Sequence, residues 1–308
     1  MDMNFKKPEI KDKNKVTEIL QRYGSIDAMS AFGTYFLWCN YFNLEICVYN
    51  DVLFSRVTKP KITYLFPRGL RANFTFKDAF KIIADLEGTN DINFTSLNEN
   101  EKKEIENSFP NKWNFTTCRD EYEYVYNRND LKNLSGKKYH KKRNHISNFN
   151  KIYNYTYNSI TSENCLKYFD FFDQWFKEHQ ENKEKYSLSE YDAISRALKN
   201  YSSLNLVGGA IKVNEEIVAC TIGEKINSTA LLVHFEKALN KYKGAYAIIN
   251  KEFSSQCDAT YKYINREEDL GIPGLRKSKL SYHPAFLISK YKTISKKGEL
   301  IWKYLIQP

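Results

Sequence analysis

Hydrophobic and polar positions alternate in blocks that predict a mixture of strands and helices along the first 130 residues. Apolar positions at helical spacing predict a helix over 13–23 that ends at Gly24, and alternating segments on either side of Asn50-Asp51 predict a hairpin. The expected strands are 44–49, 52–57, 62–66, 92–95 and 121–126, and further helices are expected at 75–86 and 98–108. This pattern is typical of an α/β layout.

The segment 131–150 predicts one basic helix at the start of the second part. Its cations are Lys137, Lys138, Lys141, Lys142 and Arg143, and helical spacing places residues 138, 141 and 142 on one face. Such a face suits the phosphates of a nucleic acid or the headgroups of a lipid surface. A plain solvated helix face has the same pattern, so both interpretations stay open.

The second part shows a longer ordered series of elements. A strand at 152–157 precedes two helices, of which the first has the apolar stripe Leu166, Phe169, Phe172 and Phe176. Three strands then follow at 204–213, 217–226 and 229–236, with tight turns between them, and after them a helix at 245–256 and a strand at 261–264. With a final helix and strand, the order from 152 to 294 resembles the GNAT acyltransferase fold.

The loop before the helix at 245 extends this resemblance. GNAT proteins carry Gln/Arg-x-x-Gly-x-Gly/Ala there, and the backbone N–H groups hold the pyrophosphate of coenzyme A. The matching residues here run from Lys241 to Tyr246, with Gly244 in register and Tyr246 where Gly or Ala belongs. The resemblance implies that Lys241, Lys243, Gly244 and Ala245 bind a donor's phosphates and that Tyr246 crowds the loop. An ordinary strand-to-helix turn is the alternative.

Three sets of segments resemble one family more specifically. They are 134–138 with 142–149, 233–238 with 244–250, and 263–271 with 274–284. Together they resemble the C-terminal catalytic domain of phosphatidylglycerol lysyltransferases in a soluble, stand-alone form, which is related to the Fem-type aminoacyltransferases. The resemblance covers nearly the whole chain. It implies two tandem GNAT-like domains, 1–130 and 131–308, with mixed, mostly antiparallel sheets flanked by helices, the first degenerate and the second carrying the site.

The same resemblance implies the site residues. Glu236, Arg266, Asp269 and Tyr282 are the expected catalytic residues, and Arg276 and Lys279 are expected to contact the donor. Glu236 either accepts a proton from the acceptor or holds an α-amine, and Tyr282 offers a hydroxyl to an oxyanion. Structural alternatives are an ion pair for Glu236, a turn cap for Asp269 and packing for Tyr282.

The net charge of +10 lies wholly in the second part. Up to residue 134, 19 Lys and Arg stand against 19 Asp and Glu, which leaves 28 against 18 for the remainder. We therefore expect an anionic partner, either tRNA or an anionic lipid surface approached peripherally. The implied activity is acyl or aminoacyl transfer to an amine or a lipid hydroxyl, with aminoacyl-tRNA or a coenzyme A thioester as donor. The alternatives are a coenzyme A-dependent N-acetyltransferase acting on a small amine and a non-catalytic anion-binding module.

Several classes are disfavoured by composition. Six Cys lie far apart without a CxxC pair, which indicates reduced thiols and a cytoplasmic location. Five His without ligand spacing argue against a metal site. The least charged stretch, 28–44, falls short of the ~20 apolar residues that a spanning helix needs.

Overall fold

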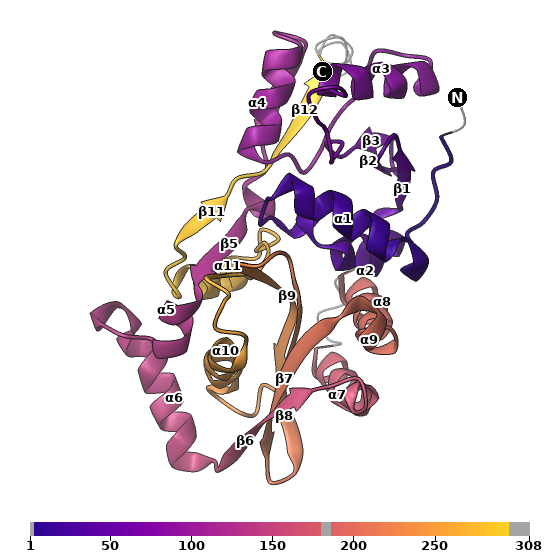
Figure 1. Ribbon diagram of the computed structural model, residues 1–308. Helices are drawn as coiled ribbons and strands as arrows, with labels where there is room; N and C mark the ends of the chain where they lie inside the picture. Colours follow the sequence, from indigo (N-terminus) through magenta and orange to yellow (C-terminus); the bar gives the residue numbers. More distant parts are fainter. Residues whose placement is uncertain (1–2, 180–185, 296–308) are drawn as a thin grey trace, which may run out of the picture. The chain divides into compact units, whose positions relative to one another are not determined.

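The computed structural model describes residues 3–179 and 186–295, which fall into two compact units (Figure 1). The first unit takes the described parts of Met1–Glu123, Glu268–Gly271 and Ile288–Pro308, and the second takes those of Tyr124–Glu267 and Ile272–Leu287. The two units are therefore interleaved in the sequence, whereas a single division after residue 130 was expected.

The first unit contains a three-stranded antiparallel sheet, β1-β2-β3, and a separate antiparallel pair, β4 with β12. Its helices and strands are α1 (Lys13–Tyr23), α2 (Phe32–Phe42), β1 (Leu44–Tyr49), β2 (Val52–Val57), β3 (Thr63–Tyr64), α3 (Phe76–Glu87), α4 (Glu99–Ser108), β4 (Trp113–Thr117) and β12 (Tyr291–Ser295).

Local sequence signals account for several of these boundaries. α1 ends at Gly24, whose left-handed φ of 73° suits glycine. Asn50 and Asp51 both have positive φ, as the two-residue turn of the β1–β2 hairpin requires. At the start of α3, the side chains of Thr75 and Asp78 form a capping box. The predicted α1 helix and hairpin are confirmed at their expected bounds.

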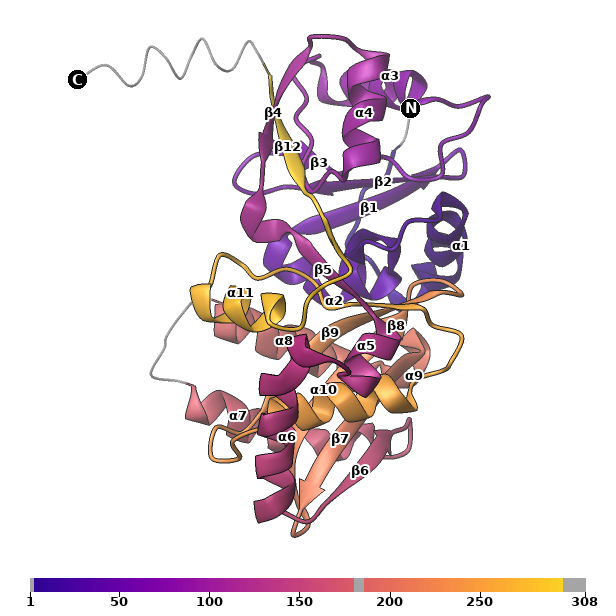
Figure 2. The ribbon, with the colours of Figure 1, turned by 90° about the vertical axis from the view of Figure 1, so that its left-hand side faces the viewer.

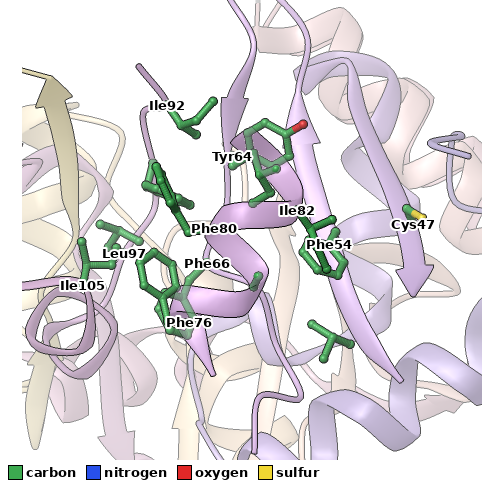
Figure 3. Close-up of a cluster of buried hydrophobic side chains, with 14 of the residues drawn as sticks. Cys47, Phe54, Tyr64, Phe66, Phe76, Phe80, Ile82, Ile92, Leu97 and Ile105 are labelled. Carbon is green, nitrogen blue, oxygen red and sulfur yellow. The ribbon is translucent and has the colours of Figure 1, made fainter. Parts of the chain in front are cut away.

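An aromatic core lies beneath α3 in the first unit (Figure 3). The rings of Phe66 and Phe76 stack with their centres 5.2 Å apart, and the edge of Phe80 meets Trp113 at 5.5 Å. The indole N–H of Trp113 donates to the carbonyl oxygen of Ile92 at 2.6 Å. Packing of this kind explains much of the aromatic content of the first part.

A buried ion network joins distant segments of the first unit. The Arg68 guanidinium binds Asp27 at 3.0 Å and Glu101 at 2.8 Å, and all three side chains are at most 3% exposed. Burial opposes ionisation of Asp27, but Arg68 outweighs it, so the pKa of Asp27 lies well below its usual value. Burial instead raises the pKa of Glu101. Arg68 is thus the cation in direct contact with both buried carboxyls, and the buried Lys290 adds to the stabilisation of each.

The second unit is built on a seven-stranded sheet in the order β11-β5-β10-β9-β8-β7-β6. Figure 1 shows α10 with α5 and α6 on one face of this sheet and α7, α8 and α9 on the other. The elements are β5 (Glu123–Asn127), α5 (Arg128–Asn133), α6 (His140–Ile152), β6 (Tyr155–Ile160), α7 (Phe169–Glu178), α8 (Tyr186–Lys199), α9 (Tyr201–Leu204), β7 (Leu206–Val213), β8 (Glu216–Lys225), β9 (Ala230–Ala238), α10 (Ala245–Gln256), β10 (Tyr263–Asn265), α11 (Pro273–Leu280) and β11 (Phe286–Ile288).

The element order expected for the second part is confirmed, and so is the mixed α/β fold with helices flanking antiparallel and mixed sheets. The structure also contains two short elements that were not expected, α9 and β11. The three-strand meander and α10 lie where the hydrophobic pattern placed them, whereas β6 starts three residues late.

Two local expectations are wrong. The single basic helix over 131–150 is instead α5 and α6, separated by a turn in which Leu134 and Gly136 have φ of 48° and 86°, values that end a helix. The expected strand at 92–95 is only an isolated bridge between Tyr64 and Phe94. The strand β4, which no sequence pattern indicated, pairs with β12 from the far end of the described chain.

Candidate functional site

The sheet of the second unit stops pairing at one point between β9 and β10. The parallel ladder joins Ala230–Leu232 of β9 to Tyr263–Asn265 of β10, and β9 then continues alone on that side to Ala238. Beyond the ladder, two side-chain ion pairs connect β9 to the segment that follows β10. Arg266 Nη2 lies 2.7 Å from Glu236 Oε1, and His234 Nδ1 lies 2.9 Å from Glu267 Oε1.

A β-bulge in β9 lies at this point. Gly223 pairs with Val233 and Ile222 pairs with Phe235, so His234 is the extra residue. A Cβ on Gly223 would lie 2.2 Å from the carbonyl oxygen of Leu232, so the close approach requires glycine. At the bulge, the side chain of His234 contacts Glu224 and Glu267. His234 stands two residues before Glu236 in β9.

Glu236 is held at both carboxylate oxygens. Oε1 accepts from Arg266, and Oε2 accepts from Asn250 Nδ2 of α10 at 3.2 Å. The side chains of Glu236 and Arg266 are 8% and 10% exposed, and Asn250 is 3% exposed. The structure therefore brings the expected residues Glu236 and Arg266 together in a buried pair, with Asn250 added.

Aromatic rings and a lysine surround this pair. The guanidinium carbon of Arg266 lies 5.0 Å from the ring centre of Tyr282 and 5.5 Å from that of Tyr126. Lys279 Nζ donates to the Arg266 carbonyl oxygen at 2.5 Å, and the Tyr126 hydroxyl donates to the Lys279 carbonyl oxygen at 2.8 Å. Burial raises the pKa of both tyrosines above their usual value, so both keep their hydroxyl protons.

Two buried polar atoms of the cluster have no hydrogen-bond partner among the described residues. They are Arg266 Nη1, a donor, and Asn250 Oδ1, an acceptor. Leaving such atoms unpaired costs about 1–3 kcal/mol each, so folded proteins rarely retain them without a bound water or ligand. The cluster of Glu236, Asn250, Arg266, Tyr126 and Tyr282 is called the Arg266 cluster below.

Lys142 completes the Arg266 cluster from α6, which packs across α10 (Figures 1 and 2). Its Nζ lies 3.7 Å from the ring centre of Tyr282, and its side chain is partly buried. Burial lowers the pKa of Lys142 to about 8, Arg266 adds to the effect and Glu236 opposes it. The sequence placed Lys142 on an outer basic face, but the side chain turns inward.

The other cations of the basic segment have different places. Lys137, Lys138 and Lys141 are exposed, and Lys138 lies 3.8 Å from Asp130. Arg143 donates to the carbonyl oxygens of Leu134 and Gly136 at 2.6 and 2.7 Å, which closes the turn between α5 and α6. A groove of about 420 Å³ lies beside this turn, lined by Asn133, Leu134, Arg143, Ile146, Ser147, Asn150, Lys151 and Lys251.

In the loop that resembles the coenzyme A-binding loop, several groups already form ion pairs or hydrogen bonds within the protein. Lys241 pairs with Glu216 at 2.7 Å, and the Ala245 N–H donates to the Tyr242 carbonyl oxygen at 3.0 Å. The N–H groups of Ala247 and Ile248 both donate to the Gly244 carbonyl oxygen. Lys243 is exposed, and Tyr246 is 42% exposed.

Packing against α6 explains Gly244. Its φ is 102°, and a Cβ there would lie 2.8 Å from the His145 carbonyl oxygen. We expect Gly244→Ala to lower the free energy of unfolding by about 1–3 kcal/mol, measured by urea denaturation, because the added methyl must displace backbone and the residue is left strained. The matched control is Gly274→Ala in α11, where no atom lies within 4 Å. Equal stability of the two variants would contradict this packing role.

Asp269 does not join the Arg266 cluster. It belongs to the first unit, is fully buried, pairs with Arg119 at 3.1 Å and accepts from the Gly271 N–H at 2.9 Å. These contacts match the turn-capping alternative. Arg276 lies part-exposed on α11, one helical turn before Lys279.

His234 is held between two carboxylates. Its side chain is fully buried, with Glu267 at 2.9 Å and Glu224 at 3.6 Å. Burial lowers the pKa of His234, but the two carboxylates outweigh it and raise it to about 10. The imidazole is therefore a structural cation at neutral pH.

Tyr126 and Asn250 were not singled out by sequence reasoning. Asn250 had a signal, since it is a polar residue among Ala247, Ile248, Ile249 and Phe253 of a largely apolar helix. Tyr126 had none, because one strand residue in an aromatic-rich chain does not stand out.

In the described ranges no helix is long and apolar enough to cross a membrane. Within residues 3–179 and 186–295, no three His, Cys, Asp or Glu side chains gather in a way that would hold a metal ion.

Residues 17–294 match the protein family described as phosphatidylglycerol lysyltransferase, C-terminal. The crystal structure of a conserved protein of unknown function from Bacteroides thetaiotaomicron is 33% identical, with 96% of this chain and 100% of that chain covered and a TM-score of 0.88. The structure of L-PGS from Bacillus licheniformis is 17% identical over 96% of this chain and 95% of that chain, with a TM-score of 0.65, and shows the shared fold.

A curated relative is an uncharacterized protein from Mycoplasmoides gallisepticum. It is 26% identical over 171 residues, which are 54% of this chain and 54% of the relative. The match thus spans about half the length of that protein.

Proposed function

The chain belongs to the phosphatidylglycerol lysyltransferase C-terminal family, and on that premise we propose that it transfers an aminoacyl group from aminoacyl-tRNA to an amine or a lipid hydroxyl. Family and fold identify the chain as an acyltransferase-like domain. The aminoacyl donor and the acceptor are the parts that the proposal adds.

The observation that carries the proposal is that the Arg266 cluster holds one unpaired donor and one unpaired acceptor, on two residues that both contact Glu236. An aminoacyl ester offers a carbonyl oxygen and an α-ammonium group. Arg266 Nη1 suits the carbonyl oxygen, whose negative charge grows as the tetrahedral intermediate forms. Asn250 Oδ1, beside the Glu236 carboxylate, suits the ammonium.

The two unpaired atoms, Arg266 Nη1 and Asn250 Oδ1, also favour an aminoacyl group over an acetyl group. An acetyl group has a carbonyl oxygen but no ammonium, so Asn250 Oδ1 would stay buried and unpaired. Sites with buried polar groups discriminate strongly against ligands that leave them unsatisfied. The engaged amides of the loop at Ala245 also weaken the case for coenzyme A.

Charge supports a polyanionic donor. The exposed Lys137 and Lys141 lie on the same segment as Lys142, and the net charge of +10 belongs to the second part of the chain. A tRNA brings phosphates that such cations bind in a salt-dependent manner. A lipid surface is the other anion that fits, as acceptor rather than donor.

The test is a transfer assay with labelled donors. The protein is incubated with tRNA charged with ¹⁴C-amino acids, together with vesicles containing phosphatidylglycerol or with a small diamine, and the label is followed into the lipid or amine fraction. We expect transfer by the wild type and none by the double variant Glu236→Gln/Arg266→Met. Absence of transfer from every charged tRNA would overturn the proposal.

A melting experiment separates the alternatives. A ligand at 100 times its dissociation constant stabilises a protein by about 2.7 kcal/mol, which a thermal melt detects. A shift with acetyl-coenzyme A, with its turnover, would favour an N-acetyltransferase. Salt-dependent binding of uncharged tRNA without turnover of any donor would favour the non-catalytic anion-binding module.

A further inference from the structure

Transfer to an amine or a hydroxyl requires a group that accepts the acceptor's proton. Glu236, the carboxylate expected for this role, has one oxygen bound by Arg266 and the other by Asn250. Both carboxylate oxygens are thus engaged with donors inside the site. The geometry therefore leaves Glu236 to bind and orient.

The other titratable groups in and around the Arg266 cluster are also unsuited to accept the acceptor's proton. Tyr126 and Tyr282 keep their protons, since burial raises the pKa of each. Lys279 Nζ is buried and already engaged as a donor to the Arg266 carbonyl oxygen at 2.5 Å. Arginine does not lose its proton in proteins.

Lys142 differs from all of these groups. In the part of the chain that the structure describes, its Nζ has no hydrogen-bond or ion-pair partner, and it lies over the ring of Tyr282, 3.7 Å from the ring centre. The charged groups that face it are Arg266 from the segment after β10 and Glu236 from β9. On its own helix Lys141 is exposed, and so is Lys138 just before the helix begins.

We propose that Lys142 is the proton-accepting residue of the transfer site, an inference that rests on the proposed function. The neutral amine of Lys142 takes the proton from the acceptor's N–H or O–H as that atom attacks the donor carbonyl carbon. A bond from the acceptor atom to this carbon forms, and the ester C–O bond to the tRNA ribose breaks. The Lys142 ammonium then returns its proton to the leaving ribose oxygen, so charge and atoms balance.

The electrostatics fit this role. Burial first, and Arg266 second, favour the neutral amine, and the pKa of about 8 leaves about one molecule in ten neutral at pH 7. General bases act best when their pKa lies near the working pH, and lysines used in this way are lowered to about 7–8. An exposed lysine, with a pKa near 10.4, is almost wholly protonated under the same conditions.

The first arm of the test needs no substrate. The native protein is labelled with a trace of acetic anhydride between pH 6 and 11, and the label at each lysine is read by peptide mass spectrometry with fragmentation. We expect half-maximal labelling of Lys142 near pH 8, clearly below the pH at which a lysine with the ordinary pKa of about 10.4 reaches it. Labelling of Lys142 in step with Lys141 would overturn the inference.

The second arm uses the transfer assay. Lys142→Arg keeps the cation but cannot accept a proton, so both Lys142→Arg and Lys142→Ala are expected to lose about 10²–10⁴-fold in rate. Added methylamine should restore part of the rate of Lys142→Ala, with a pH profile set by methylamine. The control is Lys167→Arg, an exposed lysine of the same unit, which should keep the wild-type rate.

The outcomes separate the two proposals. A Lys142→Arg variant that transfers at the wild-type rate would overturn the role of Lys142 and leave the proposed function standing. A wild type that transfers from no donor would overturn the proposed function, and the role of Lys142 in transfer would fall with it.

Discussion

Arg266→Met is expected to abolish transfer and to lower the free energy of unfolding by about 3–5 kcal/mol, because it leaves the buried Glu236 carboxylate without its cation. The same change removes the donor Nη1, which we propose binds the carbonyl oxygen. Transfer is measured in the charged-tRNA assay, and stability by urea denaturation.

The double variant Glu236→Gln/Arg266→Met separates the two effects. It removes both charges, so no unpaired buried ion remains and most of the lost stability should return, while transfer stays absent. Transfer at the wild-type rate by the double variant would contradict a role of the Arg266 cluster in the chemistry. A double variant as unstable as Arg266→Met would contradict the ion-pair explanation of the stability loss.

Arg68→Met is expected to be the most destabilising single change in the first unit, at about 3–5 kcal/mol. It leaves Asp27 and Glu101 buried with no guanidinium, although both carboxyls are at most 1% exposed. Their pKa values in the folded variant should rise, so the folded state would bind more protons than the unfolded state. Stability of the variant relative to wild type should therefore improve as the pH falls from 7 to 5.

A matched arginine lies three residues further along. Arg71 is 44% exposed and pairs with Asp51 at 3.4 Å, so Arg71→Met should cost less than about 1 kcal/mol. Urea denaturation of both variants at pH 7 and pH 5 makes the comparison. A loss for Arg68→Met no larger than that for Arg71→Met, at both pH values, would contradict the network's importance.

The candidate site was predictable in part. Glu236, Arg266, Lys279 and Tyr282 were expected from the family resemblance and lie together in the structure. Asp269 was expected with them but binds Arg119 in the first unit. The chain passes from the second unit to the first between Glu267 and Glu268, so closeness in sequence to Arg266 does not put Asp269 in the same compact unit.

Local order along this chain follows from its local sequence. The hairpin turn at Asn50-Asp51, the end of α1 at Gly24 and the meander of β7, β8 and β9 all depend on contacts between residues close in sequence. Turn residues and hydrophobic periodicity are sufficient for such elements, which is why their bounds could be predicted closely.

Long-range pairing and the direction of side chains depended on the tertiary structure. β4 exists because Tyr291–Ser295 of β12 pairs with Trp113–Thr117, about 180 residues earlier. Lys142 turns inward because the break at Leu134–Gly136 sets the rotation of α6 against α10 and Tyr282. A helical repeat tells which residues share a face, but only the packing of the helix decides which face meets the Arg266 cluster.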